Sequence, residues 1–97
     1  MLVLVSYDVS TIDRAGQRRL RRVAKACTNC GLRVQKSVFE CVLDPAQWEH
    51  LKAKLIDLID PDTDSLRFYY LGKEGRKRVE HHGANSVPDL ENDTLLL

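Results

Sequence analysis

The sequence predicts an α+β domain in which two helices cover one face of an antiparallel sheet. Three observations support this fold class: an apolar, strand-like run at residues 2–9, two segments with helical periodicity at residues 14–30 and 45–59, and two strand-rich segments at residues 32–43 and 65–71. The resulting order is the βαββαβ plan of the ferredoxin-like fold. A chain of 97 residues holds a single core of this kind.

The first predicted strand, residues 2–9, is apolar on both faces at its start. Leu2 and Leu4 lie on one face, and three valines and a tyrosine lie on the other. We therefore expect this strand in the centre of the sheet, buried on both sides. Ser6 and Asp8 follow on the face of Leu2, so Asp8 stands at the C-terminal end of a buried strand.

The first predicted helix follows a polar loop at residues 10–13 and ends at Gly31, a residue type that commonly terminates helices. Apolar residues at steps of three and four form its expected buried stripe: Leu20, Val23, Ala24, Cys27 and Cys30.

Cations gather on the face opposite this stripe, which we call the basic ridge: Arg14, Arg18, Arg21, Arg22 and Lys25. The net charge is only +1, yet residues 14–36 contain no acid. Arg19, Arg33 and Lys36 complete this segment, and Lys73, Arg76, Lys77 and Arg78 form a second basic cluster. An acid-free basic surface indicates phosphate binding by the ridge, Arg19, Arg33 and the 76–78 cluster; the alternative is a solvated helix face.

The second half of the chain completes the fold. Residues 32–43 are interpreted as two short strands that reverse at residues 35–37, with one bent strand as the alternative. Asp44, followed by a proline and then by Gln47, is typical of a helix start, and the proline after Asp60 ends that helix. A strand at residues 65–71 and a further edge strand at 76–82 follow.

We expect one domain at residues 1–82 and a tail at residues 83–97 that contacts a second subunit or a partner. The tail ends in three leucines, and apolar chain ends favour docking. The open face of the sheet needs a cover, so a homodimer through that face is expected. No segment resembles a signal peptide or a membrane span, and three cysteines cannot all pair within one chain, so we expect a cytoplasmic protein.

Asp8 is the candidate catalytic and metal-binding residue. Magnesium needs few protein ligands, because it keeps its waters and takes substrate phosphates. One carboxylate per subunit, doubled by a twofold axis, could hold Mg²⁺ or another divalent metal such as Mn²⁺ against a phosphodiester and activate water. The alternative is an aspartate that caps a loop or pairs with an arginine.

Other motifs favour structural roles. Cys27 and Cys30 fit the buried stripe better than a zinc or redox site, since too few further ligands are available and the pair lies at the wrong end of a helix. His81 and His82 point to opposite faces of a strand, so at most one could be a general base; exposed edge positions are the alternative. Four aromatic residues fit the core better than base stacking: Tyr7, Phe39, Tyr69 and Tyr70.

Four segments resemble the CRISPR-associated protein two family, the smaller core protein of the CRISPR adaptation module. They are LVLVSYDV at residues 2–9, RRLRRVAKAC at 18–27, GLRVQKSVFEC at 31–41 and DSLRFYYLG at 64–72. The match extends over nearly the whole chain, and the four segments occur in a specific order and spacing.

This resemblance implies a ferredoxin-like homodimer with metal-dependent endonuclease activity on RNA or double-stranded DNA. It implies a role in spacer acquisition for antiviral defence, with dimers of the CRISPR integrase, protein one, as partners. The family's magnesium ligand falls on Asp8, and its helix-one arginines fall within residues 18–22. Further family positions, which we assign to nucleic-acid binding, fall on Arg33, Ser37 and Phe39. Two alternatives remain open: a non-catalytic DNA-binding scaffold of the integration complex, and a ligand-binding regulatory domain of the same fold.

Overall fold

The computed structural model describes residues 1–72 and 78–84. Seven elements follow one another in these residues: β1 (Leu2–Asp8), α1 (Arg14–Cys30), β2 (Gly31–Gln35), β3 (Val38–Val42), α2 (Pro45–Leu58), β4 (Ser65–Leu71) and β5 (Arg78–Gly83).

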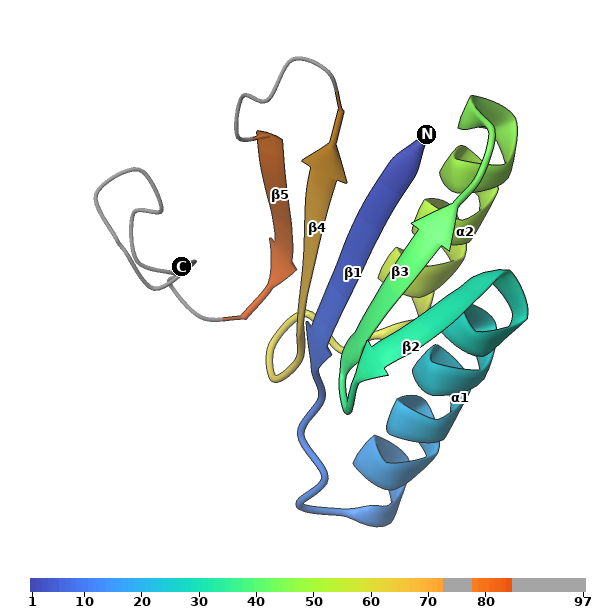
Figure 1. The fold of residues 1–97 in the computed structure, drawn as a ribbon. Helices are drawn as coiled ribbons and strands as arrows, with labels where there is room; N and C mark the ends of the chain where they lie inside the picture. Colours follow the sequence, from blue (N-terminus) through green and yellow to red (C-terminus); the bar gives the residue numbers. More distant parts are fainter. Residues whose placement is uncertain (73–77, 85–97) are drawn as a thin grey trace.

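The five strands form one sheet in the order β2-β3-β1-β4-β5, with every neighbouring pair antiparallel. The expected α+β, ferredoxin-like architecture is therefore confirmed, and β1 occupies the central position. Both helices lie on the same side of the sheet, which leaves its other face open (Figure 1). The expected reversal within residues 32–43 occurs at Lys36 and Ser37, between β2 and β3. The expected edge strand is β5; residues 85–97 of the predicted tail lie outside the described residues.

Side chains from the inner face of the sheet and from both helices form the core. Val3, Val5 and Tyr7 of β1 are buried against the helices, as are Phe39 of β3 and Phe68 of β4. The expectation that β1 is buried on both faces is wrong for the single chain. Leu2 and Leu4 lie on the open face and are only half-buried, because no helix covers that side.

Local sequence signals determine where the helices begin. Asp13 caps α1 by accepting a hydrogen bond from the Gly16 amide at 2.8 Å. Asp44 and Gln47 form a reciprocal capping box at α2, with hydrogen bonds of 2.7 and 2.9 Å. The helix start predicted at Asp44 is therefore confirmed.

Trp48 packs the inner face of α2 against β4. Its indole ring meets the ring of Phe68 edge-on, with centroids 4.9 Å apart, and its Nε1 donates to Tyr70 Oη at 3.2 Å. This contact attaches α2 to β4 and fixes the helix layer over the sheet. Within the described residues, no helix is long and apolar enough to span a bilayer.

Candidate functional site

Asp8 ends the central strand and is exposed to solvent. In the β1–β4 ladder it lies opposite Ser65, and alternation along β1 places it on the open face with Leu4 and Ser6. None of the ion pairs between described residues involves Asp8. Its carboxylate is thus available to a ligand, and the alternative in which Asp8 pairs with an arginine is not observed in this part of the chain.

The donors around Asp8 suit a cation that brings its own waters. Among residues 1–72 and 78–84 no group of three or more metal-ligating side chains surrounds a common point. A single hard carboxylate at an exposed strand end fits magnesium, which is commonly held by one or two carboxylates together with substrate oxygens. It does not fit zinc, whose sites require three or four protein ligands.

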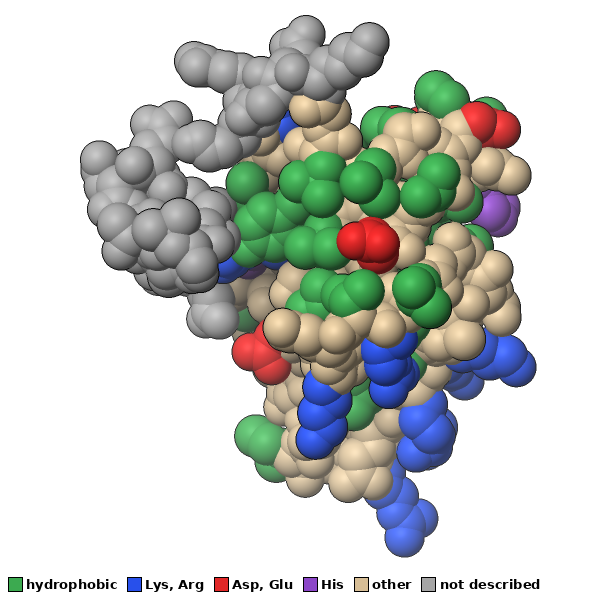
Figure 2. Space-filling model, in the orientation of Figure 1, with side chains coloured by type: hydrophobic (Ala, Val, Ile, Leu, Met, Phe, Trp, Pro, Cys, Tyr) green, Lys and Arg blue, Asp and Glu red, His purple; other side chains and the backbone are tan. Residues whose placement is uncertain are grey.

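The basic ridge lies along the outer face of α1. All five of its side chains are exposed: Arg14, Arg18, Arg21, Arg22 and Lys25. Figure 2 shows cationic side chains gathered at the lower end of the molecule, where Figure 1 places α1. The N-terminal end of the ridge and Asp8 therefore lie at the same end of the fold, because Asp8 leads directly into the loop that starts α1.

Arg19 differs from the ridge residues on either side of it. Its Nε donates to Asp64 Oδ2 at 2.8 Å, and its Nη2 donates to Asp64 Oδ1 at 3.4 Å. Asp64 is 0% exposed and is the buried charged residue of the described chain. Burial alone would raise the pKa of Asp64, but hydrogen bonds from Arg19 and from the amides of Asp60 and Ser10 lower it below its usual value. The guanidinium of Arg19 therefore binds Asp64 within the protein.

Asp64 was not singled out by the sequence, in which it is one of several acids between residues 57 and 64. The available signal is its place directly before a predicted strand. A carboxylate there can accept hydrogen bonds from neighbouring loop amides. Its long-range partner Arg19 is 45 residues away, which no local pattern reveals.

The other predicted nucleic-acid contacts are divided between surface and core. Arg33 is exposed on β2, and its guanidinium lies 5.1 Å from the ring centroid of Phe39. Phe39 itself is fully buried and stacks on Tyr7, so it is not available to a base in this structure. Ser37 is half-buried in the β2–β3 turn, where its carbonyl oxygen accepts from the Tyr7 amide at 3.1 Å. Arg78 is exposed beside Tyr70, whereas residues 76 and 77 lie outside the described residues.

The histidines and cysteines take the places that strand and helix geometry predict. His82 faces the helices and lies 2.7 Å from Glu80 Oε2, whereas His81 pairs with Arg67 in the β4–β5 ladder and lies on the open face. Both histidines lie on the edge strand β5, as expected, but they are half-buried, so the expected exposure is wrong. Cys27 is fully buried in the core, in agreement with a packing role, and Cys30 is half-buried.

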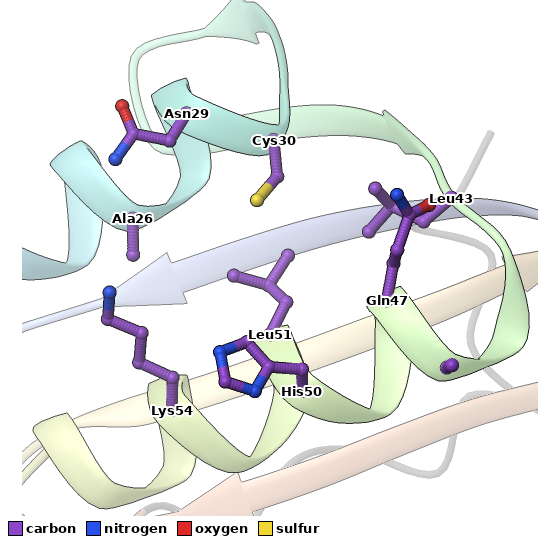
Figure 3. Close-up of a pocket in the computed structure, with 9 residues that line it drawn as sticks. Ala26, Asn29, Cys30, Leu43, Gln47, His50, Leu51 and Lys54 are labelled. Atoms are coloured by element: carbon purple, nitrogen blue, oxygen red, sulfur yellow. The ribbon is translucent and has the colours of Figure 1, made fainter.

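A shallow groove of about 540 Å³ runs between α1 and α2 on the helix side. Figure 3 shows Cys30 of α1 and Gln47, His50 and Lys54 of α2 around it, with Leu51 on its floor. This groove lies on the opposite side of the sheet from Asp8, so it is separate from the candidate metal site.

Comparison with known proteins identifies the family. The family model described as CRISPR associated protein Cas2 matches residues 1–79. The chain belongs to the Cas2 family. The resemblance drawn from the four sequence segments is thus confirmed.

Cas2 proteins from several bacteria are similar to this chain over its whole length. The CRISPR-associated endoribonuclease Cas2 of Chlorobaculum tepidum is 59% identical over 96 residues, which cover 99% of this chain and 100% of that protein. The CRISPR-associated endonuclease Cas2 of Halalkalibacterium halodurans is 54% identical over 95 residues, 98% and 99% of the two chains. The crystal structure of Streptococcus pyogenes Cas2 at pH 6.5 matches with a TM-score of 0.69 and 56% identity, covering 75% of this chain and 88% of that one.

Proposed function

We propose that this Cas2 protein is a metal-dependent endonuclease that acts in the acquisition of CRISPR spacers. The observation that carries the proposal is an exposed Asp8 at the end of the central strand, without an ion-pair partner among residues 1–72 and 78–84 and next to an acid-free basic helix. The names of its relatives, endoribonuclease and endonuclease, support phosphodiester hydrolysis as the reaction. Both RNA and double-stranded DNA are proposed substrates, because the basic ridge would bind phosphates, which both nucleic acids contain, and would not distinguish their bases.

We propose that two copies associate through the open face of the sheet. This face carries a patch of half-buried and exposed apolar side chains, visible in Figure 2 around a central acidic residue. The cross-strand pairing assigns the following apolar side chains to this patch: Leu2, Leu4, Leu32, Val38, Val42, Tyr69 and Leu71. Asp8 lies on the same face, so a twofold axis near its end of the sheet would bring the two Asp8 carboxylates toward one another.

Two Asp8 carboxylates would bind one divalent cation, Mg²⁺ or Mn²⁺, in the dimer. When bound, the metal would supply an activated water and neutralise charge that develops on the phosphate. Asp8 holds and orients the site from a rigid strand end rather than from a loop. The ridge arginines bind the backbone on either side of the scissile phosphate and restrict the orientations of the substrate.

The remaining partner we propose is the CRISPR integrase, protein one, which binds through the C-terminal tail. The support lies in the sequence, whose last three residues are leucines that follow three acids. Deletion of residues 84–97 should abolish co-elution with the integrase in size-exclusion chromatography. Undiminished co-elution of the truncated chain would refute this role of the tail.

The decisive experiment measures cleavage of RNA and of duplex DNA by purified protein with Mg²⁺, in parallel with Asp8→Asn. Asn keeps the shape of the side chain and removes the charge, so the variant should fold and lose at least 100-fold in rate. Asp62→Asn, an exposed loop aspartate, is the matched control and should cleave at the wild-type rate. Equal rates for wild type and Asp8→Asn would overturn the catalytic assignment.

A scaffold without catalysis is the second candidate function, favoured by the extent of the basic ridge. It predicts no cleavage on either substrate, together with spacer acquisition that survives Asp8→Asn and is lost when the ridge arginines are replaced. The same set of variants therefore distinguishes the two functions.

A further inference from the structure

Asp64 connects several of the chain segments that meet at the Asp8 end of the sheet. Its Oδ1 accepts hydrogen bonds from the Ser10 amide at 3.0 Å and from Thr63 Oγ1 at 3.1 Å. Its Oδ2 accepts from Arg19 Nε at 2.8 Å and from the Asp60 amide at 2.9 Å. One buried carboxylate thus connects the loop after β1, helix α1, and the loop that leads from α2 to β4.

The backbone of Asp64 extends this connection to β5. Its carbonyl oxygen accepts a hydrogen bond from the Ala84 amide at 2.8 Å. Gly83 adopts φ +102°, and a Cβ at that position would lie 2.1 Å from the same oxygen. The end of β5 therefore lies directly against Asp64 and leaves no space for a side chain.

A second close contact fixes the start of α1 on the loop after Asp8. A Cβ on Gly16 would lie 1.9 Å from the carbonyl oxygen of Ser10. Ser10 is thus held from two sides, since its amide donates to Asp64 and its carbonyl packs on the first turn of α1. These two contacts fix the backbone of Ser10, two residues beyond Asp8, relative to the start of α1.

Asp64 also precedes the residue that lies opposite Asp8 in the sheet. Asp8 lies opposite Ser65 in the β1–β4 ladder, and Asp64 is the residue before Ser65. Asp64 therefore constrains Asp8 along two routes: through Ser10 in the loop that follows Asp8, and through Ser65 on the adjacent strand.

We propose that the Arg19–Asp64 ion pair is the positioning element of the Asp8 site. It holds the catalytic strand end and the phosphate-binding helix in one fixed relation, so that a phosphodiester bound by the ridge is presented to Asp8. Arg19 acts through Asp64 rather than on the substrate. This inference rests on the proposed nuclease function and extends it to two residues with no role in that proposal.

The test uses folded full-length protein and conservative substitutions. Asp64→Asn retains one acceptor oxygen, which cannot replace both Oδ1 and Oδ2, so either the Ser10 or the Asp60 hydrogen bond must be lost. Arg19→Met removes the charge at similar length, and Arg19→Lys restores the charge with a single donor group. Activity is measured against Mg²⁺ and substrate concentration, and amide hydrogen exchange is measured at Ser10 and Asp60.

Two controls separate positioning from other effects. Arg18→Met alters an exposed neighbour of Arg19 on the ridge and should raise KM with little change in kcat. Leu51→Ala weakens the core beneath the α1–α2 groove, so it lowers the melting temperature without touching the Asp8 end. Per folded molecule, its kcat and Mg²⁺ requirement should equal those of the wild type.

Positioning predicts a specific pattern. Arg19→Met and Asp64→Asn should lower kcat at least tenfold, raise the Mg²⁺ concentration for half-maximal activity severalfold, and change KM less than twofold. Arg19→Lys should recover part of kcat. Folded Arg19→Met and Asp64→Asn proteins with wild-type kcat and Mg²⁺ dependence would overturn the proposal.

The exchange measurement keeps the proposal testable if the wild type cleaves neither substrate, a result that would overturn the nuclease function alone. Exchange at Ser10 or Asp60 should then be at least tenfold faster in Asp64→Asn, whereas exchange at Val5 in the middle of β1 should be unchanged. Unaltered exchange at both amides would overturn the positioning role.

Discussion

Lys52 on α2 and Glu80 on β5 form an ion pair with a distance of 2.8 Å between Lys52 Nζ and Glu80 Oε2. Glu80 Oε1 also accepts a hydrogen bond from Tyr70 Oη at 2.6 Å, and His82 Nε2 lies 2.7 Å from Glu80 Oε2. Burial would raise the pKa of Glu80, but the hydrogen bonds from Lys52, Tyr70 and His82 lower it to about 2. One carboxylate therefore attaches the outermost strand to the helix layer.

Glu80 makes stability depend on pH in the acid range. Its pKa is lowered in the folded state from 4.5 to about 2, so its stabilising contribution is present above about pH 4.5 and disappears as the pH falls toward 2. Because the pair is partly exposed and screened, we expect about 1–2 kcal/mol. Thermal melts of Glu80→Gln and wild type should differ at pH 7 and converge near pH 2. Glu49→Gln, on the exposed face of α2, should melt like the wild type at both pH values; equal melting of Glu80→Gln at pH 7 would contradict the assignment.

Thiol reactivity should differ sharply among the three cysteines. Burial raises the pKa of Cys27 to about 12 and that of Cys41 to about 11, so both stay protonated and unreactive at pH 8. Cys30 reaches the α1–α2 groove. A chromogenic disulfide reagent should modify one thiol quickly in native protein and all three after denaturation. Cys30→Ser should remove the fast phase, and a fast phase that persists in this variant would refute the assignment.

Nucleic-acid binding should depend steeply on salt. Each phosphate neutralised on B-DNA releases about 0.9 of a counterion. Replacement of Arg18 and Arg22 by alanine should therefore lower the slope of log Kd against log salt by up to ~2. Lys54→Ala removes an exposed cation on the groove side of α2 and should leave the slope unchanged. Binding curves for duplex DNA between 50 and 200 mM salt measure this, and an unchanged slope in the double variant would mean that the ridge is only solvated.

The open face should control association. Val42 is 74% exposed in the single chain, so Val42→Arg should leave the fold intact while placing a charge in the proposed dimer interface. Light scattering at micromolar concentration should report two chains for the wild type and one for this variant, with at least tenfold weaker association. Ile12→Arg changes a 92% exposed side chain outside the patch and should remain dimeric. A wild type that is monomeric under these conditions would refute the interface.

Local signals predicted most of the fold. The helix start after the polar loop at residues 10–13, the helix start at Asp44, the helix end at Gly31 and the strand alternation were all predicted. Each involves residues within four positions of one another, which is the range over which helix and turn chemistry acts. The order of these elements along the chain then predicted the ferredoxin-like plan, which the family resemblance also implied.

The site was predicted only in part, because its organisation depends on contacts between distant segments. The place of Asp8 at a strand end was predicted from the sequence, and its role in catalysis stays a prediction. The role of Arg19 could not, since Arg18 and Arg19 have the same chemistry in sequence and only the rotation of α1 turns one outward and the other toward Asp64. Phe39 was assigned to nucleic acid by resemblance, whereas its side chain fills the core beside Tyr7.

The β2 edge of the sheet has a consequence for behaviour at high concentration. An unpaired strand edge normally invites edge-to-edge growth into aggregates. Here the β2–β3 register shifts between Arg33 and Gln35, which interrupts the regular ladder, and the exposed Arg33 and Lys36 place like charges along the rim. Two such rims repel one another, so concentrated solutions should resist fibril formation at low ionic strength and lose part of that protection as salt is added.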